Sequence, residues 1–486
     1  MINEKTIEKV IDELSFVQLK SEIKEENSVK HFVIGTQTKD GLSPLEWKVA
    51  ISPYYPFKVD DKEPINFFNT SLITYPHIMR SGFVCLHTPK VEDAETQFLI
   101  DLSRLKEWID KYYVRKEKDD HYEELVVERK LIDDIYYNFF YTDTSNEFPH
   151  GDYGTVDLVM LVPGCHDGKR MDTFLANTFN SKAHNAQNGC QWEQGLQRQI
   201  KFEGIYCFLD KAPSVYDKFI IELYTDMSSL FSWSQMEFLK MWSQKKHDAK
   251  RVPLFCGYKI PNGETRWQVA MLKANDFPIK SEKTRCGGRP IINNTFKKAL
   301  IDWATTYNCS YNYFFGRGSL PSKVAEKKIL IIGIGAIGSM VATTLVRCGA
   351  KYLDYYDIDL KEPGNICRSD YDFLSGVSDK TYELSSILHS ISPFVQCEIP
   401  SKALDSGIKQ SIDNEGIKKT VQEVLNRYDI IFDCSTDDGL MYALDKLNLK
   451  AKVINLSISN HANEIVCAIG SNIAKTIKVL FSQIIE

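Results

Sequence analysis

Three closely spaced glycines and an aspartate form the most chemically informative pattern in the 486-residue sequence. Gly333, Gly335 and Gly338 follow an apolar run at 328–332, and Asp357 comes nineteen residues after the last glycine. Glycines at this spacing allow a tight turn, a close approach to phosphate, and close packing of a strand against the next helix. The helix N-terminus offers free N–H groups to an anion, and Asp357 can accept hydrogen bonds from a ribose. The pattern therefore predicts a nucleotide site.

Four polar residues further along the chain bear on which nucleotide binds. Asn365, Arg368 and Lys380 come first, and Asp437 follows the apolar run at 429–434. An enzyme that activates a carboxylate with ATP can employ all four. The two cations and the amide can bind phosphate, and the carboxylate of Asp437 can hold Mg²⁺ between phosphates. An NAD-dependent oxidoreductase, which the glycines alone also allow, gives Arg368 and Asp437 no role. The sequence therefore favours ATP with Mg²⁺.

In their order and spacing these residues resemble the adenylation domain of the ubiquitin-activating enzyme, MoeB and ThiF superfamily, from about 327 to 470. The resemblance implies that Asp357 binds ribose and that Asp437 binds Mg²⁺ and is essential for adenylation. It also implies that the remaining cofactor-binding residues are Asn365, Arg368 and Lys380, with Arg368 acting in catalysis as well.

The activating cysteine of that superfamily follows the adenylation aspartate. From the aspartate's strand onward this sequence holds only Cys434 and Cys467, both in segments expected to be strands. We therefore expect the activating cysteine either to lie beyond the given chain or to be absent from the protein.

Cys85 is a second candidate for chemistry. It lies in the run Gly82–Leu86, ten residues after the start of Tyr75-Pro76-His77. A thiolate there can carry an acyl group as a thioester, whereas a buried core thiol is the alternative interpretation. Over roughly the first 115 residues the chain resembles a ubiquitin-conjugating domain, whose His-Pro-Asn motif precedes the catalytic cysteine. The resemblance implies that Cys85 is the nucleophile and that His77 stands where the oxyanion-stabilising Asn is found.

A conjugating domain ahead of an activating domain is similar to the bacterial fusions of CBASS antiphage systems, the CD-NTase-associated conjugating family. This implies ligation of the C-terminal tail of a CD-NTase, a cGAS-like synthase, to a target protein amine, which primes the synthase, and a homodimer formed through the adenylation domain. A ubiquitin-like protein of another bacterial system is an alternative substrate. A nucleotide-sensing scaffold with an inert Cys85 is the non-enzymatic alternative.

Composition limits the class of protein. The formal net charge is -6 without a long basic block, which argues against nucleic-acid binding as the main activity. Twelve cysteines occur without a C-x-x-C pair, a pattern typical of a reducing cytoplasm. The most apolar window is interrupted by the three glycines, so no membrane span is expected.

The elements that position these residues predict a multidomain α/β and α+β protein. We expect a conjugating-like α+β domain at 1–145, a central mixed domain of unknown role at 146–290, and a Rossmann-like adenylation domain at 291–486. The first has expected helices at 4–22 and 93–113 and expected strands at 31–36, 46–52 and 65–69. After the first domain we expect strands at 155–162, 201–209, 219–225 and 267–272, helices at 234–242 and 294–306, and a linker at 273–290.

Overall fold

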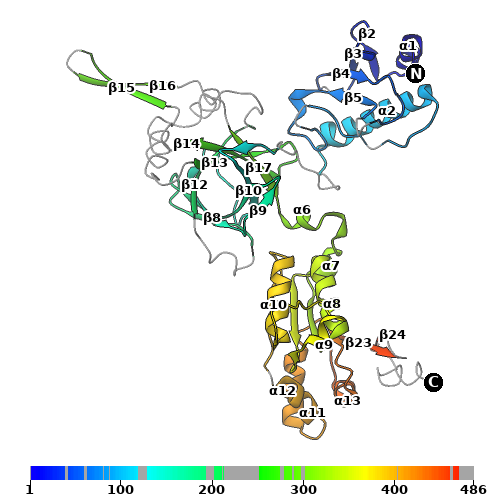
Figure 1. Cartoon of the computed structure of the whole chain (residues 1–486), viewed down its shortest axis with the longest axis vertical. Helices are drawn as coiled ribbons and strands as arrows, with labels where there is room; N and C mark the ends of the chain where they lie inside the picture. Colours follow the sequence, from blue (N-terminus) through cyan, green and yellow to red (C-terminus); the bar gives the residue numbers. More distant parts are fainter. Residues whose placement is uncertain are drawn as a thin grey trace. The chain divides into compact units, whose positions relative to one another are not determined.

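The computed structural model describes residues 2–38, 42–59, 63–79, 82–86, 88–118, 129–192, 202–210, 212, 251–273, 279–286, 289–296, 302–401, 403–459 and 463–469. The chain divides into two compact units (Figure 1). Unit 1 comprises 1–190 and 199–313, and unit 2 comprises 191–198 and 314–486. No helix in the described ranges is both long and apolar enough to cross a bilayer.

The N-terminal part of unit 1 is an antiparallel sheet packed against two helices. The strand order is β1-β3-β4-β5, with β2 paired to β3. The elements are α1 (Glu4–Glu13), β1 (Val17–Leu19), β2 (Lys24–Glu26), β3 (Val29–Thr36), β4 (Leu45–Ile51), β5 (Ile65–Phe68), the 3-10 helix η1 (Thr70–Leu72), α2 (Ala94–Trp108) and the π-helical turn η2 (Ile109–Val114). The expected strands and the second expected helix are confirmed. The helix expected at 4–22 is too long, because Leu14 is extended and Val17 pairs with Thr36.

The remaining part of unit 1 is a closed barrel. Seven strands close it in the order β10-β8-β12-β13-β14-β17-β7, and β7 pairs back with β10. Three short strands, β6, β9 and β11, extend the sheet. The bounds are β6 (Leu131–Ile132), β7 (Ile135–Tyr141), β8 (Tyr153–Met160), β9 (Gly164–His166), β10 (Lys169–Ser181), β11 (Gln187–Gly189), β12 (Phe202–Phe208), β13 (Arg251–Lys259), β14 (Thr265–Lys273) and β17 (Trp303–Asn308).

Two expectations around the barrel are wrong. The expected linker at 273–290 contains β15 (Ile279–Cys286), which forms a hairpin with β16 (Arg289–Phe296). The expected helix at 294–306 is replaced by the end of β16 and by β17, because pairing with β7 and β14 outweighs the local helical pattern. The strand expected at 219–225 and the helix expected at 234–242 lie outside the described residues.

The barrel extends past both expected domain boundaries. β7 precedes residue 145 and β17 follows residue 290, and both are hydrogen-bonded members of the same sheet. Most of its described residues are in strands. Large aromatic side chains fill the barrel, as in other small barrels whose interiors are packed by side chains. Among them Phe179 and Trp267 stack with their ring centroids 4.6 Å apart.

Unit 2 contains a five-stranded sheet of order β19-β18-β22-β23-β24. The first four strands are parallel, and β24 is an antiparallel edge strand. The bounds are α6 (Tyr311–Phe315, which begins in unit 1), the 3-10 helix η3 (Gly316–Gly318), α7 (Ser322–Ala325), β18 (Lys328–Ile332), α8 (Ala336–Arg347), β19 (Tyr352–Tyr356), β20 (Leu360–Lys361), α9 (Pro363–Ile366), β21 (Ser378–Asp379), α10 (Lys380–Ile391), α11 (Leu404–Gln410), α12 (Glu415–Leu425), β22 (Ile430–Asp433), α13 (Asp438–Lys446), β23 (Lys452–Ser459) and β24 (Glu464–Ile469).

Strand β18 is buried on both faces, which explains its uninterrupted apolar run. Ile329 and Ile331 pack with α8 and α10 on one face, and Leu330 and Ile332 pack with α11, α12 and α13 on the other. The chain continues from β18 to β19 on one side and later to β22 on the other. The carboxyl ends of β18 and β22 therefore flank the point where strand order reverses, which is where open α/β sheets bind ligands.

Candidate functional site

The glycine loop joins β18 to α8, as the sequence predicts. Gly333 has a φ of 83°, and a Cβ there would lie 2.6 Å from the Ser435 Cα in the loop after β22. A Cβ on Gly338 would lie 1.9 Å from the Gly333 carbonyl oxygen. These two glycines are therefore required by packing within the protein.

Gly335 is different from its two neighbours. It is the N-cap of α8, and a Cβ there would meet no protein atom within 4 Å. No protein atom therefore occupies the space beside Gly335 at the helix N-terminus. A phosphate fits this position because the first N–H groups of a helix lack intrahelical partners.

Asp357 lies beside the glycine loop. Its Oδ2 accepts a hydrogen bond from the Ile334 N–H at 2.9 Å, and its Oδ1 accepts one from the Asp359 N–H at 2.8 Å. The Lys380 ammonium, at the start of α10, lies 3.6 Å from Asp357 Oδ1 and 3.1 Å from Asp359 Oδ2. The structure therefore brings together Asp357, Lys380 and the loop, three features that the sequence predicts to share one site.

Asn365 and Arg368 lie on and just after the short helix α9. Asn365 Oδ1 accepts a hydrogen bond from the Glu362 N–H at 2.9 Å, so this amide caps its own helix. The Arg368 side chain is exposed and forms no ion pair with a described residue. No contact among the described residues joins either side chain to the glycine loop, and their roles in phosphate binding stay predictions.

Asp437 caps α13 at the end of the loop after β22. Its Oδ1 accepts a hydrogen bond from the Leu440 N–H at 3.0 Å, and its Oδ2 accepts one from the Lys409 ammonium at 2.7 Å. The bond from Lys409 lowers the pKa of Asp437, so this carboxylate is ionised near neutral pH. Lys409 also lies 3.2 Å from Asp405. Lys409 belongs to no motif in the sequence, so its place beside Asp437 is not predictable from the pattern of residues.

A buried ion pair fixes the segment between β19 and α10. Lys361 and Glu383 are 0% and 4% exposed, and their charged atoms are 2.7 Å apart. The ammonium also donates to the Asp372 carbonyl and to Ser375 Oγ, each at 2.7 Å. Burial opposes ionisation of Glu383, but hydrogen bonds from Lys361 and Ser378 outweigh it and lower the pKa of Glu383. This pair went unrecognised in the sequence because its members are far apart in the chain.

Cys85 lies in unit 1 between β5 and α2, where it is partly accessible. Its N–H donates to the His77 carbonyl at 2.8 Å, which joins the predicted nucleophile to the Tyr75-Pro76-His77 turn. Trp108 Nε1 donates to the Pro76 carbonyl at 2.9 Å and holds the same turn against α2. A small cavity of about 80 Å³ borders Cys85, and its lining includes Phe67.

The His77 ring is buried, and its Nε2 lies 3.2 Å from the Tyr112 hydroxyl oxygen. His77 has a φ of 60°, which is uncommon for a residue other than glycine. The structure therefore joins His77 to Cys85 through the backbone and joins the ring to Tyr112. The role of His77 at an oxyanion stays a prediction.

The two cysteines considered in the adenylation domain differ in environment. Cys434 is buried beneath the glycine loop, and burial raises the pKa of its thiol to about 12. Cys467 lies exposed on the edge strand β24. Cys434 is therefore a protonated core thiol, and it directly follows β22 (Ile430–Asp433) instead of lying in a strand as expected.

The parallel sheet, the glycine loop and the carboxylate beyond the second strand define a Rossmann-like nucleotide-binding domain. Residues 311–453 match the model of the ThiF family, so this part of the chain has the Rossmann-like fold of ThiF adenylation domains. The match is to this domain and covers the glycine loop and all five of the predicted nucleotide- and metal-binding side chains.

Among curated proteins, the chain is similar to the ATP-dependent ubiquitin transferase-like protein Cap2 of Enterobacter hormaechei subsp. hoffmannii. The two are 31% identical over 159 residues, which is 33% of this chain and 25% of Cap2. Ubiquitin-like modifier-activating enzyme 5 of Caenorhabditis elegans is 33% identical over 78 residues, which is 16% of this chain and 18% of that protein. The chain thus matches a quarter or less of the length of these two relatives.

Solved structures that overlap with the chain include E. coli MccB with ATP. That overlap has a TM-score of 0.24 and 19% identity, and covers 28% of this chain and 39% of the MccB chain.

We predict that Gly338→Ala destabilises unit 2, because the new methyl group must displace the Gly333 carbonyl. Overpacking of this kind costs about 1–3 kcal/mol. The measurement is the free energy of unfolding in urea. Gly364→Ala is the matched control, since a Cβ at this position in α9 meets no atom within 4 Å. Equal losses in both variants would contradict the packing role of Gly338.

We also predict that Glu383→Gln lowers the free energy of unfolding of unit 2 by about 3–5 kcal/mol, because it leaves the Lys361 charge buried without its counterion. The control is Glu326→Gln, which breaks a pair with Lys351 at a half-exposed carboxylate. A pair of that kind contributes about 0–1 kcal/mol. Equal losses in the free energy of unfolding for the two variants would show that the buried pair of Lys361 stabilises unit 2 no more than an exposed pair does.

Proposed function

We propose that unit 2 adenylates the C-terminal carboxylate of a protein with ATP, and that Cys85 then carries the acyl group to an amine. The observation that carries the proposal is the position of Asp357, Lys380 and Asp437 around one strand-order switch point in a domain that matches the ThiF family. This arrangement supports ATP over NAD, because hydride transfer gives Asp437 no task.

The proposed chemistry proceeds in four steps. A carboxylate oxygen attacks the α-phosphorus of ATP, and the bond to pyrophosphate breaks to give an acyl adenylate. A thiolate then attacks the carbonyl carbon and AMP leaves, and further thioester exchange brings the acyl group to Cys85. Finally an amine attacks the thioester, the thiolate leaves, and the amine proton passes to solvent. Division into these steps replaces a free carboxylate, which is a poor electrophile, by activated esters.

The groups of unit 2 suit the first step. The open N-terminus of α8 at Gly335 accepts a phosphate, and Asp357 presents its carboxylate for the ribose. Lys380 and the exposed Arg368 supply positive charge where negative charge accumulates on the phosphates. We propose that the Asn365 amide also binds phosphate.

Magnesium fits Asp437. Mg²⁺ in such sites is held by one or two carboxylates together with substrate phosphates and water. Asp437 is ionised, and the described residues contain no group of three or more side chains able to hold a metal alone. When bound, Mg²⁺ neutralises the charge of the departing pyrophosphate. Lys409 donates to Asp437 Oδ2, and the remaining lone pairs of this carboxylate are available to the metal.

The substrate we propose is the C-terminal tail of a CD-NTase, a cGAS-like synthase of CBASS antiphage defence, which becomes primed when it is joined to a target protein amine. This choice rests on the resemblance of the sequence to the conjugating fusions of CBASS systems, and the similarity to Cap2, an ATP-dependent ubiquitin transferase-like protein, supports the class of reaction. A ubiquitin-like protein is the second candidate, and the similarity to ubiquitin-like modifier-activating enzyme 5 favours it. We further propose a homodimer formed through the adenylation domain, acting in the cytoplasm.

We predict that the full chain catalyses ATP–pyrophosphate exchange that depends on a C-terminal peptide of the substrate. Asp437→Ala and Arg368→Ala should each reduce this exchange to background while the fold is kept. The measurement is incorporation of labelled pyrophosphate into ATP across a panel of CD-NTase and ubiquitin-like C-terminal peptides, and the active peptides identify the substrate class.

Asp438→Ala is the matched control, because this neighbouring carboxylate is exposed at the start of α13 and has no place in the proposal. It should retain exchange. Wild-type exchange in Asp437→Ala or Arg368→Ala would exclude the proposed roles, and binding of NAD in place of ATP would favour the oxidoreductase alternative.

We predict that Cys85→Ser leaves pyrophosphate exchange unchanged and stops amide formation, because an oxyester is a much poorer acyl donor than a thioester. The assay follows transfer of a labelled peptide onto the chain and then onto an amine, on gels without reductant. Cys165→Ser is the control, since Cys165 is an exposed thiol on β9. Conjugation by Cys85→Ser at the wild-type rate would leave the N-terminal domain only a binding role.

A further inference from the structure

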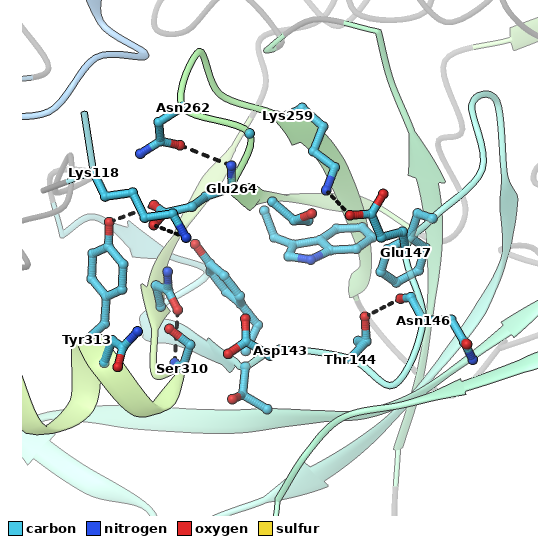
Figure 2. Close-up of a pocket in the computed structure, with 18 of the residues that line it drawn as sticks. Lys118, Asp143, Thr144, Asn146, Glu147, Lys259, Asn262, Glu264, Ser310 and Tyr313 are labelled. Carbon is cyan, nitrogen blue, oxygen red and sulfur yellow. Dashed lines mark hydrogen bonds and ion pairs between the residues drawn. The ribbon is translucent and has the colours of Figure 1, made fainter. Parts of the chain in front are cut away.

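A polar cavity of about 440 Å³ opens at one end of the barrel in unit 1. The segments that line it are the chain after β7, the turn between β13 and β14, and the chain after β17. Its volume falls within the range of about 300–1,000 Å³ that is typical of small-ligand sites. The proposed adenylation and transfer steps assign it no task. We call it the barrel cavity (Figure 2).

Three carboxylates surround the barrel cavity, and two of them have partners. Glu147 lies 3.6 Å from the Lys259 ammonium, and Glu264 accepts a hydrogen bond from the Tyr313 hydroxyl at 3.0 Å. Lys118 lies 4.0 Å from Glu264 Oε1, but its side chain is 73% exposed and at the rim. Figure 2 shows the Glu147 pair on one side of the cavity and Glu264 on the other, with Asp143 between them.

Asp143 is the carboxylate without a partner. It makes neither a hydrogen bond nor an ion pair with any residue in the described part of the chain. Partial burial and the negative charge of Glu264 both raise the pKa of Asp143, while Lys118 opposes them. Two carboxylates that face one cavity, one of them unpaired, favour occupation by a cation.

Two further polar atoms in the wall lack partners. Thr142 is 5% exposed, and its Oγ1 is buried without a hydrogen bond to any described residue. The Nδ2 of Asn262 is also buried and unpaired in the described structure, although Asn262 Oδ1 accepts a hydrogen bond from the Glu264 N–H at 3.0 Å. Buried polar atoms are nearly always satisfied, so these two point to a ligand that offers hydrogen-bonding groups of its own.

The rest of the wall suits an apolar stem. Phe148 and Trp267 line the barrel cavity with their ring centroids 5.0 Å apart. Both side chains are largely buried, so the surface they present is confined to this cavity and its surroundings. Alkyl chains pack well against such rings, and an ammonium group is attracted to aromatic faces as well as to carboxylates.

We propose that the barrel cavity binds a primary amine on an alkyl stem, with its ammonium group at Asp143 and Glu264 and its stem against Phe148 and Trp267. Thr142 Oγ1 then accepts a hydrogen bond from the ammonium group, and Asn262 Nδ2 donates to a carbonyl of a ligand that has one, as a peptide does. A lysine side chain of a peptide and a free diamine both have this chemistry. The inference stands apart from the proposed adenylation, since it depends on unit 1 alone.

The experiment is calorimetric titration of the full chain with three probes: cadaverine, Nα-acetyl-lysine methylamide, and Nα-acetyl-norleucine methylamide, which keeps the stem and lacks the charge. We expect at least one amine to bind and the norleucine compound not to bind. Asp143→Asn should weaken amine binding about tenfold to a hundredfold, because it removes one charged hydrogen-bond partner. Thr142→Val is a second variant that should also weaken binding.

Asp167→Asn is the matched control, because this carboxylate is 82% exposed and does not line the cavity. It should bind the amine as the wild type does. Binding of the lysine compound alone would show that the site recognises a lysine within a peptide. Binding of both amines would show that the ammonium group and its alkyl stem are sufficient. No amine binding to the wild type, equal binding of the norleucine compound, or unchanged affinity in both Asp143→Asn and Thr142→Val would overturn the proposal.

Discussion

The segment that carries two residues of the proposed nucleotide site is anchored by one buried ion pair, between Lys361 and Glu383. The segment between these residues leaves the sheet after β19 and returns as α10, and it carries Arg368 and Lys380. Such an excursion has few apolar anchors of its own. A charge pair with almost no solvent access is costly unless its geometry is satisfied, so it tolerates few alternative arrangements of the segment.

The hydrogen bonds around that pair extend its influence to the glycine loop. The Lys361 ammonium and the Glu383 carboxylate both contact the chain at 372–378. Immediately before it, the Tyr371 hydroxyl donates to the Ile334 carbonyl at 2.6 Å. Ile334 in turn donates its N–H to Asp357. The buried pair and the proposed ribose ligand are thus connected through a short series of hydrogen bonds.

The sequence predicted those parts of the site that depend on neighbouring residues. The glycine loop is recognisable locally, because the three glycines stand between an apolar strand and a helix, although Gly333 also packs against Ser435 in the distant loop after β22. The partners of the charged side chains are distant: Lys409 binds Asp437 from 28 residues away. No spacing rule identifies such a lysine, because its position depends on how α11 packs on the sheet.

The same distinction explains the errors in the fold. In unit 2 the alternation of apolar strands and amphipathic helices has one compact solution, and the strands at 328–332, 352–356 and 430–433 follow it. The barrel closes through pairings between distant segments, such as β10 with β7, which no local pattern specifies. A segment such as 303–308 takes its structure from those partners, and its local helical pattern was therefore misleading.

The cysteines differ in burial, and burial determines whether a thiol can ionise and react. Cys190 lies in unit 1 and Cys434 in unit 2, and desolvation raises the pKa of each thiol to about 12, which keeps both protonated near neutral pH. Accessibility alone does not select a nucleophile, since Cys165 and Cys467 are exposed on strands. Cys85 differs because its backbone is fixed by the turn at His77 and a small cavity lies beside it. A held backbone with a partly accessible thiol is the combination that repeated acyl loading requires, since the sulfur must return to one position after each transfer.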